Sequence, residues 1–543
     1  MILFAILLLS MFITIALIPI IKNWAVKINV MDMPNERKVH TRPVPRAGGI
    51  AMAFGWLMPV LFWLPHDRFV VGVLIGAGIV VVLGLIDDIV ELNHKLKFIG
   101  QAIAAIIVMV VGQVKITFLG TLLPAGYILP EWLAIAVTLL VIIGVTNAIN
   151  LADGLDGLAG GIVLLSFLGI AVLAYQAGNT TIALFAVAVI GATFGFLRFN
   201  TYPATVFMGD AGSEALGFLA VTLALKLTQG GASFSPLVPL LLLGFPILDT
   251  AAVMVERVRK GRNIFIADKN HFHHKLMDRG LYHTEAVFFI YIFHAFLVTI
   301  AFVFRFYSDW ILLMAYLIIS GALLSLSSSA ESRGWRLERP GFIDRAIKGR
   351  LKGFKQEKLF ITMSFRVIEI CVPGLLIITS FLVRGMPSYL KISTLVMIVL
   401  MLLTWIFRSN WFALILRIAV YLLVPFIVYL SEVAMISAWP QYVLNSYNLS
   451  FGLLILCVIL TLKLTRRTKG FKSSPLDFLI LFIALAIPNL PDPQIQSFHM
   501  QLIAVKIIVF FFSYEVLIGE RRGELNQLGL WTTAALIVFV LNG

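Results

Sequence analysis

Long apolar runs, separated by short polar segments, extend along the whole chain. A membrane-spanning helix needs about 20 mostly apolar residues, and the runs predict about eleven spans in the first part of the chain and about seven in the last third. These spans lie at 3–21, 48–64, 69–86, 98–116, 131–149, 160–177, 181–197, 213–228, 236–255, 286–306, 309–328, 360–383, 390–407, 411–430, 450–465, 475–489, 500–518 and 527–542. We therefore expect an all-α polytopic membrane protein.

Composition supports this class and excludes several others. Of the 543 residues, 60% are hydrophobic and 13% are charged, whereas a soluble domain has about 25% charged residues. The two cysteines lie in apolar stretches, which excludes a disulfide scaffold or a cysteine-rich zinc site. The net charge of +14 is explained by basic cytoplasmic loops rather than by a nucleic-acid partner.

Basic residues in alternate loops predict the orientation in the membrane. Roughly 25 Lys and Arg residues of the first part fall on one side and about four on the other, so the first side is expected to be cytoplasmic. Both termini are then expected to lie outside. Arg384 and Lys391 also fall outside, and they are the main exceptions to this distribution of basic residues.

A charged stretch at 329–359 divides the chain. We expect a membrane domain at 1–328, a basic cytoplasmic linker at 329–359, and a C-terminal multi-span region of unknown role at 360–543. The linker is either a solvated segment or a basic amphipathic helix on the inner leaflet. For isolated ionisable residues of the last region, such as Lys506, we favour snorkelling or pairing between helices over a functional role.

Polar residues of the first part collect at the cytoplasmic ends of predicted spans. Asp87 and Asp88 end the third span, and paired carboxylates suit Mg²⁺. Helical neighbours point about 100° apart, so one would ligate while the other orients or accepts a proton. The alternative is two solvated residues at a helix end.

The run NAINLADGLDGLAGG, at 147–161, is too polar for membrane depth without a purpose. Asn147, Asn150, Asp153 and Asp156 recur every third residue, which on a helix stacks them on one face that could bind a nucleobase or a sugar. The alternative is a glycine-rich turn.

Asp210 lies between Gly209 and a run of small residues at the start of the next predicted span. Helix N-termini favour anions, so Asp210 could carry a metal toward a phosphate there, or it could simply be an N-cap. Glu214 is assigned to the first turn of the helix, without a function.

Three histidines in four residues, His271, His273 and His274, follow five basic residues that include Arg262. This spacing favours a phosphate clamp over a zinc site. Together the clusters suggest phosphoryl transfer between a soluble nucleotide compound and a lipid phosphate. A transporter is the rival class. It predicts internal repeats and ionisable groups near mid-membrane, whereas the polar clusters of this sequence gather at one face of the membrane and no internal repeat is found.

The sequence resembles the polyprenyl-phosphate N-acetylhexosamine-1-phosphate transferases. The matching motifs, in order, are DMPNERKVHTRPVPRAGG, GLIDD with Lys97 and Gln101 downstream, NAINLADGLDGLAGG, RFN-x-YPA-x-VFMGDAGS and ILDT…GRNIFIADKNHFHH. They cover roughly 1–330, which corresponds to the eleven or so spans that the family fold implies.

The resemblance implies transfer of a sugar 1-phosphate from a UDP-N-acetyl sugar to undecaprenyl phosphate in the bacterial inner membrane. Mg²⁺ is the implied cofactor, with Mn²⁺ as an alternative, and the oligomeric state stays open, a homodimer included. By motif, Asp87, Asp88 and Asp210 are the implied catalytic and metal-binding acids. The implied substrate-binding residues are Lys97, Asn147, Asn150, Asp153, Asp156, Arg262, His271, His273 and His274.

The sugar is the less defined part of this prediction. The His-Phe-His-His-Lys sequence is more similar to the branch that uses UDP-GlcNAc than to the one that uses UDP-MurNAc-pentapeptide. Other UDP-N-acetyl sugars remain alternatives. Direct in-line attack by the lipid phosphate is the preferred mechanism, with a covalent phospho-aspartate route as its rival.

Overall fold

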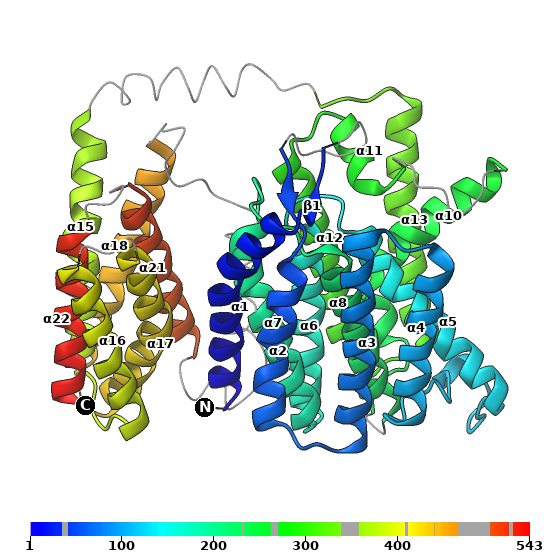
Figure 1. Ribbon diagram of the computed structural model, residues 1–543, viewed down its shortest axis with the longest axis horizontal. Coiled ribbons are helices and arrows are strands. Elements are labelled where there is room, and N and C mark those ends of the chain that lie inside the picture. Colours follow the sequence, from blue (N-terminus) through cyan, green and yellow to red (C-terminus); the bar gives the residue numbers. More distant parts are fainter. Residues whose placement is uncertain are drawn as a thin grey trace. The chain divides into compact units, whose positions relative to one another are not determined.

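The computed structural model describes residues 2–34, 42–230, 233–261, 270–337, 358–407, 411–438, 440–464, 500–520 and 525–543. The chain forms two compact units, divided after Glu338. Helices dominate both (Figure 1), and the fold class is confirmed. Ten helices of the described part are long and apolar enough to cross a membrane, and three shorter apolar helices accompany them.

Unit 1 has a helix for each span predicted in 1–328. Its elements are α1 (Ile2–Lys27), β1 (Met31–Asp32), β2 (Val44–Pro45), α2 (Gly48–Trp63), α3 (Arg68–Val90), α4 (His94–Val110), η1 (Gly120–Leu122), α5 (Glu131–Leu151), α6 (Leu158–Gln176), α7 (Thr180–Asn200), α8 (Gly209–Gln229), α9 (Val238–Leu242), α10 (Gly244–Arg259), α11 (Phe272–Asp278), α12 (His283–Val303) and α13 (Asp309–Ser332). The helix α13 continues four residues into the segment predicted as linker.

The predicted span 236–255 is divided into α9 and α10. Pro246 explains the break, because it has no N–H to donate to the carbonyl of Leu242. That carbonyl instead accepts a hydrogen bond from Ser166 Oγ of α6, at 2.7 Å. The break therefore leaves no unpaired carbonyl at this position and lets α10 take its own direction.

The helix α8 lies at the centre of unit 1, where it packs against α2, α3, α5 and α6. Small residues allow a close approach, as in other membrane helix pairs. A Cβ on Gly84 of α3 would lie 2.5 Å from the backbone nitrogen of Ala211, and one on Gly217 would lie 2.9 Å from Thr146 Cα of α5. These contacts fix the end of α3 beside the first turn of α8 and bring α5 against the turns that follow.

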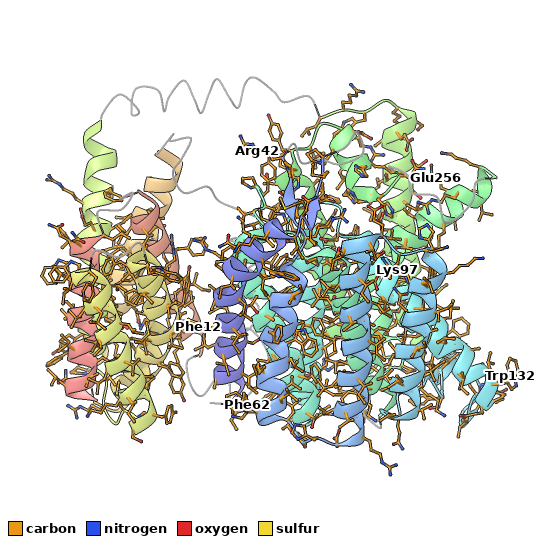
Figure 2. All side chains as sticks on the ribbon, viewed as in Figure 1. Phe12, Arg42, Phe62, Lys97, Trp132 and Glu256 are labelled. Atoms are coloured by element: carbon orange, nitrogen blue, oxygen red, sulfur yellow. The ribbon has the colours of Figure 1, made fainter. Side chains whose placement is uncertain are left out.

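Apolar side chains cover the outside of unit 1 (Figure 2). Phe62 and Trp132 are largely exposed, as expected of side chains that face lipid. Arg42 and Glu256 lie toward the end where β1 and α11 are found. The short sheet of that end pairs Met31 with Pro45 and Asp32 with Val44.

Unit 2 consists of α15 (Lys358–Phe381), α16 (Ser388–Ile406), α17 (Phe412–Ala438), α18 (Gln441–Leu464), α21 (Met500–Glu520) and α22 (Asn526–Asn542). Six of its predicted spans have a helix, and the span predicted at 475–489 lies outside the described residues. Lys506 forms a buried ion pair with Glu432 and lies 4.2 Å from the ring centroid of Tyr447. The pairing predicted for Lys506 is thus confirmed.

Candidate active site

Asp87 and Asp88 occupy the last turn of α3, and their side chains diverge as predicted for helical neighbours. Asp87 Oδ1 accepts a hydrogen bond from Leu92 N, at 2.6 Å, which closes the turn after the helix. Its Oδ2 lies 3.0 Å from Lys97 Nζ. Asp87 thereby joins the end of α3 to the first turn of α4.

Asp88 caps a different helix from the one that carries it. Its Oδ1 accepts a hydrogen bond from Asp210 N, at 3.0 Å, and its Oδ2 accepts one from Ala211 N, at 3.2 Å. Gly209 has φ +68°, and a Cβ there would lie 2.3 Å from Asp88 Oδ2. A carboxylate thus replaces the missing N-cap side chain of α8, and the N-cap alternative for Asp210 is wrong because Met208 holds that position.

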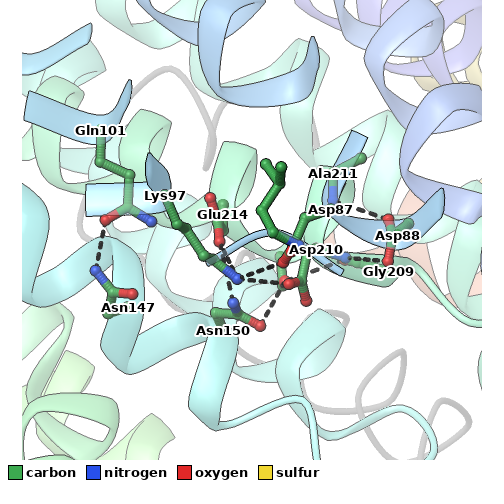
Figure 3. Close-up of polar contacts among 12 residues, drawn as sticks. Asp87, Asp88, Lys97, Gln101, Asn147, Asn150, Gly209, Asp210, Ala211 and Glu214 are labelled. Atoms are coloured by element: carbon green, nitrogen blue, oxygen red, sulfur yellow. Dashed lines mark hydrogen bonds and ion pairs between the residues drawn. The ribbon is translucent and has the colours of Figure 1, made fainter. Parts of the chain in front are cut away.

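Lys97 is the centre of the cluster (Figure 3). Its Nζ lies 2.5 Å from Asp210 Oδ2, 2.7 Å from Glu214 Oε1 and 3.0 Å from Asp87 Oδ2. An ammonium group has three N–H donors, so three carboxylates occupy all of them. Glu214, which the sequence left without a function, is part of this cluster.

Asn147 and Asn150 project from the last turns of α5 toward the same region (Figure 3). Asn150 Nδ2 donates to Glu214 Oε1, at 3.2 Å, and its Oδ1 accepts from Ser213 Oγ, at 3.1 Å. Asn147 Nδ2 donates to Gln101 Oε1 of α4, at 2.6 Å. The two asparagines therefore connect α5 with α4 and α8.

The prediction of one helical face for four residues is wrong in its second half. The helix α5 ends at Leu151, so Asp153 and Asp156 lie in the turn before α6. Gly157 has φ +81°, a left-handed conformation that glycine adopts readily, and it is the N-cap residue of α6. The glycine-rich turn that was the alternative is therefore correct for this part.

This turn, 152–157, is fixed by contacts to distant segments. Asp156 Oδ2 accepts from Ala204 N, at 2.8 Å, and Asp156 N donates to His283 Nε2, at 3.1 Å. Gly157 N donates to Asn200 Oδ1, at 3.0 Å. Burial raises the pKa of Asp153 to about 7, and the nearby carboxylates of Asp156, Asp88 and Asp32 add to the shift.

The histidine motif lies at the start of α11. Asp249 of α10 accepts from the His271 ring, with 2.9 Å between Oδ2 and Nδ1, and from Phe272 N, at 2.7 Å. Asp249 thus fixes the ring orientation of His271, although only the motif ILDT pointed to it in the sequence. His274 lies beside His273, with ring centroids 4.3 Å apart, and Arg262 lies outside the described residues.

His273 connects the histidine motif to the turn 152–157. A Cβ on Gly154 would lie 2.5 Å from His273 Nε2, so only glycine leaves room for the ring. Burial and the neighbouring charge of His274 lower the pKa of His273 to about 3. His273 is therefore neutral at pH 7, and it could contact a phosphate through an N–H group but not as a cation.

The predicted catalytic acids, Lys97 and the asparagines come together around the start of α8, whereas His273 meets the neighbouring turn. Glu214 and Asp249 were missed as site residues, since their roles depend on contacts between helices that a single sequence does not display. In the part of the chain that the structure describes, no group of three His, Cys, Asp or Glu residues forms a preassembled metal site.

The fold and this cluster define a polytopic membrane protein with a partly buried acidic site at the end of a helical bundle. The sequence pattern of the family described as Glycosyl transferase family 4 matches residues 70–228, which include α3 to α8 and most of the site. The chain belongs to this family, and the resemblance found in the motifs is confirmed.

Proteins from three bacteria are similar to this chain over more than half of its length. A Bacillus subtilis (strain 168) protein named "Probable undecaprenyl-phosphate N-acetylglucosaminyl 1-phosphate transferase" is 38% identical over 285 residues, which are 52% of this chain and 79% of the relative. Two proteins named "Undecaprenyl-phosphate alpha-N-acetylglucosaminyl 1-phosphate transferase" also match. The Yersinia pestis protein is 32% identical over 364 residues, 64% of this chain and 95% of its own. The Escherichia coli (strain K12) protein is 31% identical over 345 residues, 60% of this chain and 90% of its own.

Proposed function

We propose that the protein transfers N-acetylglucosamine 1-phosphate from UDP-GlcNAc to undecaprenyl phosphate, which gives lipid diphosphate-linked GlcNAc and UMP. The reaction would initiate a cell-envelope polysaccharide. The names and coverage of the relatives support it. Among the contacts of the site, the cluster of Asp87, Lys97 and Asp210 carries the proposal, because phosphoryl transfer depends on positioned charges of both signs.

Mg²⁺ fits the residues present. Asp87 and Asp210 both reach Lys97 Nζ, so their carboxylates lie close together, and both side chains are partly exposed. Hard oxygen donors of this kind suit Mg²⁺, and Mn²⁺ would also be accepted. We assign Asp87 and Asp210 as its principal ligands, while Asp88, whose oxygens both accept backbone hydrogen bonds, would contribute remaining lone pairs. The bound cation would neutralise phosphate charge during transfer.

Direct in-line displacement is the proposed mechanism. A phosphate monoester has a second pKa of about 6, so the lipid phosphate is largely dianionic at pH 7 and needs no general base. Its oxygen attacks the phosphorus bonded to the sugar, a P–O bond forms, and the bond to UMP breaks. Lys97 would face the charged phosphates. The polar groups of Asn147, Asn150, Asp153 and Asp156 would bind the nucleotide, and His271, His273, His274 and Arg262 would lie near the phosphates.

A cavity of about 690 Å³ between α10 and α13 is the candidate place for the lipid substrate. Its walls include Phe245, Leu248 and Leu323, and its charged lining residues are Arg259, Lys275, Asp249, Glu256 and Glu331. The apolar part of these walls suits a prenyl chain. From the basic loops we infer that this end of unit 1 is cytoplasmic and that both termini lie outside.

UMP release by the purified protein tests the proposal. The reaction contains UDP-GlcNAc, undecaprenyl phosphate and Mg²⁺, with Asp210→Asn as the site variant and Glu131→Gln as its control. Glu131 is an exposed carboxylate at the first residue of α5, at the opposite end of that helix from Asn150. Release that needs the lipid and Mg²⁺ and is lost only in Asp210→Asn supports the function. UMP release only with another UDP-N-acetyl sugar would change the assignment of the donor. No UMP release with any UDP-N-acetyl sugar would overturn the proposal.

A further inference from the structure

Glu214 is buried in the centre of the bundle, one helical turn after Asp210 on α8. Only 1% of its side chain is exposed. A buried carboxylate is costly unless charge and hydrogen bonds compensate it. Both compensations are present here, because Lys97 Nζ of α4 lies 2.7 Å from Oε1 and Asn150 Nδ2 of α5 donates to the same oxygen at 3.2 Å.

The three carboxylates around Lys97 differ in exposure. The side chains of Asp87 and Asp210 are 13% and 30% exposed, so a cation or a phosphate can reach them. Glu214 is out of reach of such a ligand. When a ligand occupies Asp87 and Asp210, Glu214 is the carboxylate of the three that still holds the Lys97 ammonium.

We propose that Glu214 is a positioning residue that holds Lys97 and Asn150 in place while Asp87 and Asp210 exchange Lys97 for a divalent cation. This inference rests on the proposed function but extends it to a residue that need not contact a substrate. With Glu214 neutral, Lys97 has only Asp87 and Asp210 as anionic partners. The ammonium then competes with the cation for them, and it also shifts from its position toward the phosphates.

Glu214→Gln tests this role, because the amide keeps the shape and an acceptor for Asn150 but removes the charge. We expect kcat for UMP release to fall about 10- to 100-fold with a smaller change in KM for the UDP-sugar. The Mg²⁺ concentration for half-maximal thermal stabilisation of the substrate-free protein should rise several-fold. Glu214→Asp, which keeps the charge with a shorter reach, should recover part of both effects.

A double-mutant cycle separates action through Lys97 from a direct effect of charge on the cation. In the Lys97→Met background, Glu214→Gln should change the Mg²⁺ midpoint by less than about twofold. An effect of the same size in both backgrounds would overturn the proposal, as would a Glu214→Gln variant with wild-type kcat and Mg²⁺ midpoint.

Melting temperature without ligands shows whether each variant folds, and Glu214→Asp replaces Glu214→Gln in the cycle if the amide variant does not. The Mg²⁺ midpoint needs no substrate. If wild-type protein releases no UMP, the proposed function fails, while the cycle on Mg²⁺ stabilisation still decides the role of Glu214.

Discussion

The Asp88 carboxylate on α3 accepts a hydrogen bond from the Asp210 backbone N–H on α8, at 3.0 Å. The residue that caps α8 is therefore 122 positions away along the chain from the residue that it caps. This contact fixes the direction of the first turn of α8, and with it the Asp210 side chain that reaches Lys97. Stability of α8 and geometry of the site are thus coupled through one carboxylate.

Asp88→Ala is expected to affect both properties. Loss of a capping side chain costs about 1 kcal/mol, which should lower the melting temperature by a few degrees. UMP release should fall at least about 100-fold, because the first turn of α8 carries Asp210. The matched control is Asp67→Ala, since Asp67 caps α3 by accepting from Val70 N, at 2.8 Å, far from the site. A similar loss of stability in both variants, with loss of activity in Asp88→Ala alone, is expected; equal activity would contradict it.

Lys97→Met should make the protein more dependent on a divalent cation for stability. In this variant, three carboxylates lose the Lys97 ammonium that they share. Removal of one member of a buried ion pair costs about 3–5 kcal/mol of stability. The cost is smaller here, because 16% of the Lys97 side chain is exposed. Mg²⁺ should therefore raise the melting temperature of this variant more than that of the wild type. UMP release should be lost at every Mg²⁺ concentration. Lys95→Met, at an exposed neighbouring position, is the control, and an identical Mg²⁺ response in the two variants would count against this account.

Long apolar runs made the helices of unit 1 predictable, since a membrane span has few alternatives to a helix. The acidic residues 87, 88 and 210 were also identifiable, because charge beside an apolar run needs a reason. The arrangement of the site residues in space was harder to predict from the sequence. A spacing of three placed Asp153 and Asp156 on the same helix as the two asparagines. The helix α5 instead ends at Leu151 and a turn follows, which local spacing does not reveal.

Glu214 illustrates what a single sequence could not provide. The predicted span 213–228 put it in the first turn of a helix, where acidic residues are common. That position is wrong, because α8 begins at Gly209 and Glu214 lies beyond its first turn. Its partners, Lys97 and Asn150, lie 117 and 64 positions away, on helices that close approach at glycines brings together. The signal was a carboxylate inside a largely apolar predicted span, where it needs a partner.

Gly154→Ala should disturb the histidine motif without unfolding the protein. The added Cβ would lie 2.5 Å from His273 Nε2, so the ring must move. We expect kcat/KM to fall roughly 10-fold with a small change in melting temperature. Gly144→Ala is the matched control, because a Cβ at that position of α5 has nothing within 4 Å. Equal kcat/KM values for the two variants would show that the position of His273 does not matter for the reaction.

Asp153 makes the stability of the ligand-free protein depend on pH. Its pKa in the folded protein is about 7, above the ordinary 3.8, mainly because burial disfavours the charged form. The folded state therefore binds the proton more tightly than the unfolded state, so this residue lowers stability progressively as the pH rises from about 4 to about 7, and the penalty is complete above that range. Asp153→Asn carries a neutral amide at every pH and avoids the penalty.

The melting temperatures of the wild type and Asp153→Asn, measured without ligands from about pH 4 to about pH 9, test this relationship. They should nearly coincide at the acidic end, and the variant should melt a few degrees higher at about pH 8. Glu131→Gln, which changes an exposed carboxylate at the first residue of α5, should show no such divergence. A constant difference across the range would mean that the amide alters packing rather than charge. A lower melting temperature for Asp153→Asn at pH 8 would mean that the ionised carboxylate is stabilised in the folded protein, contrary to the raised pKa.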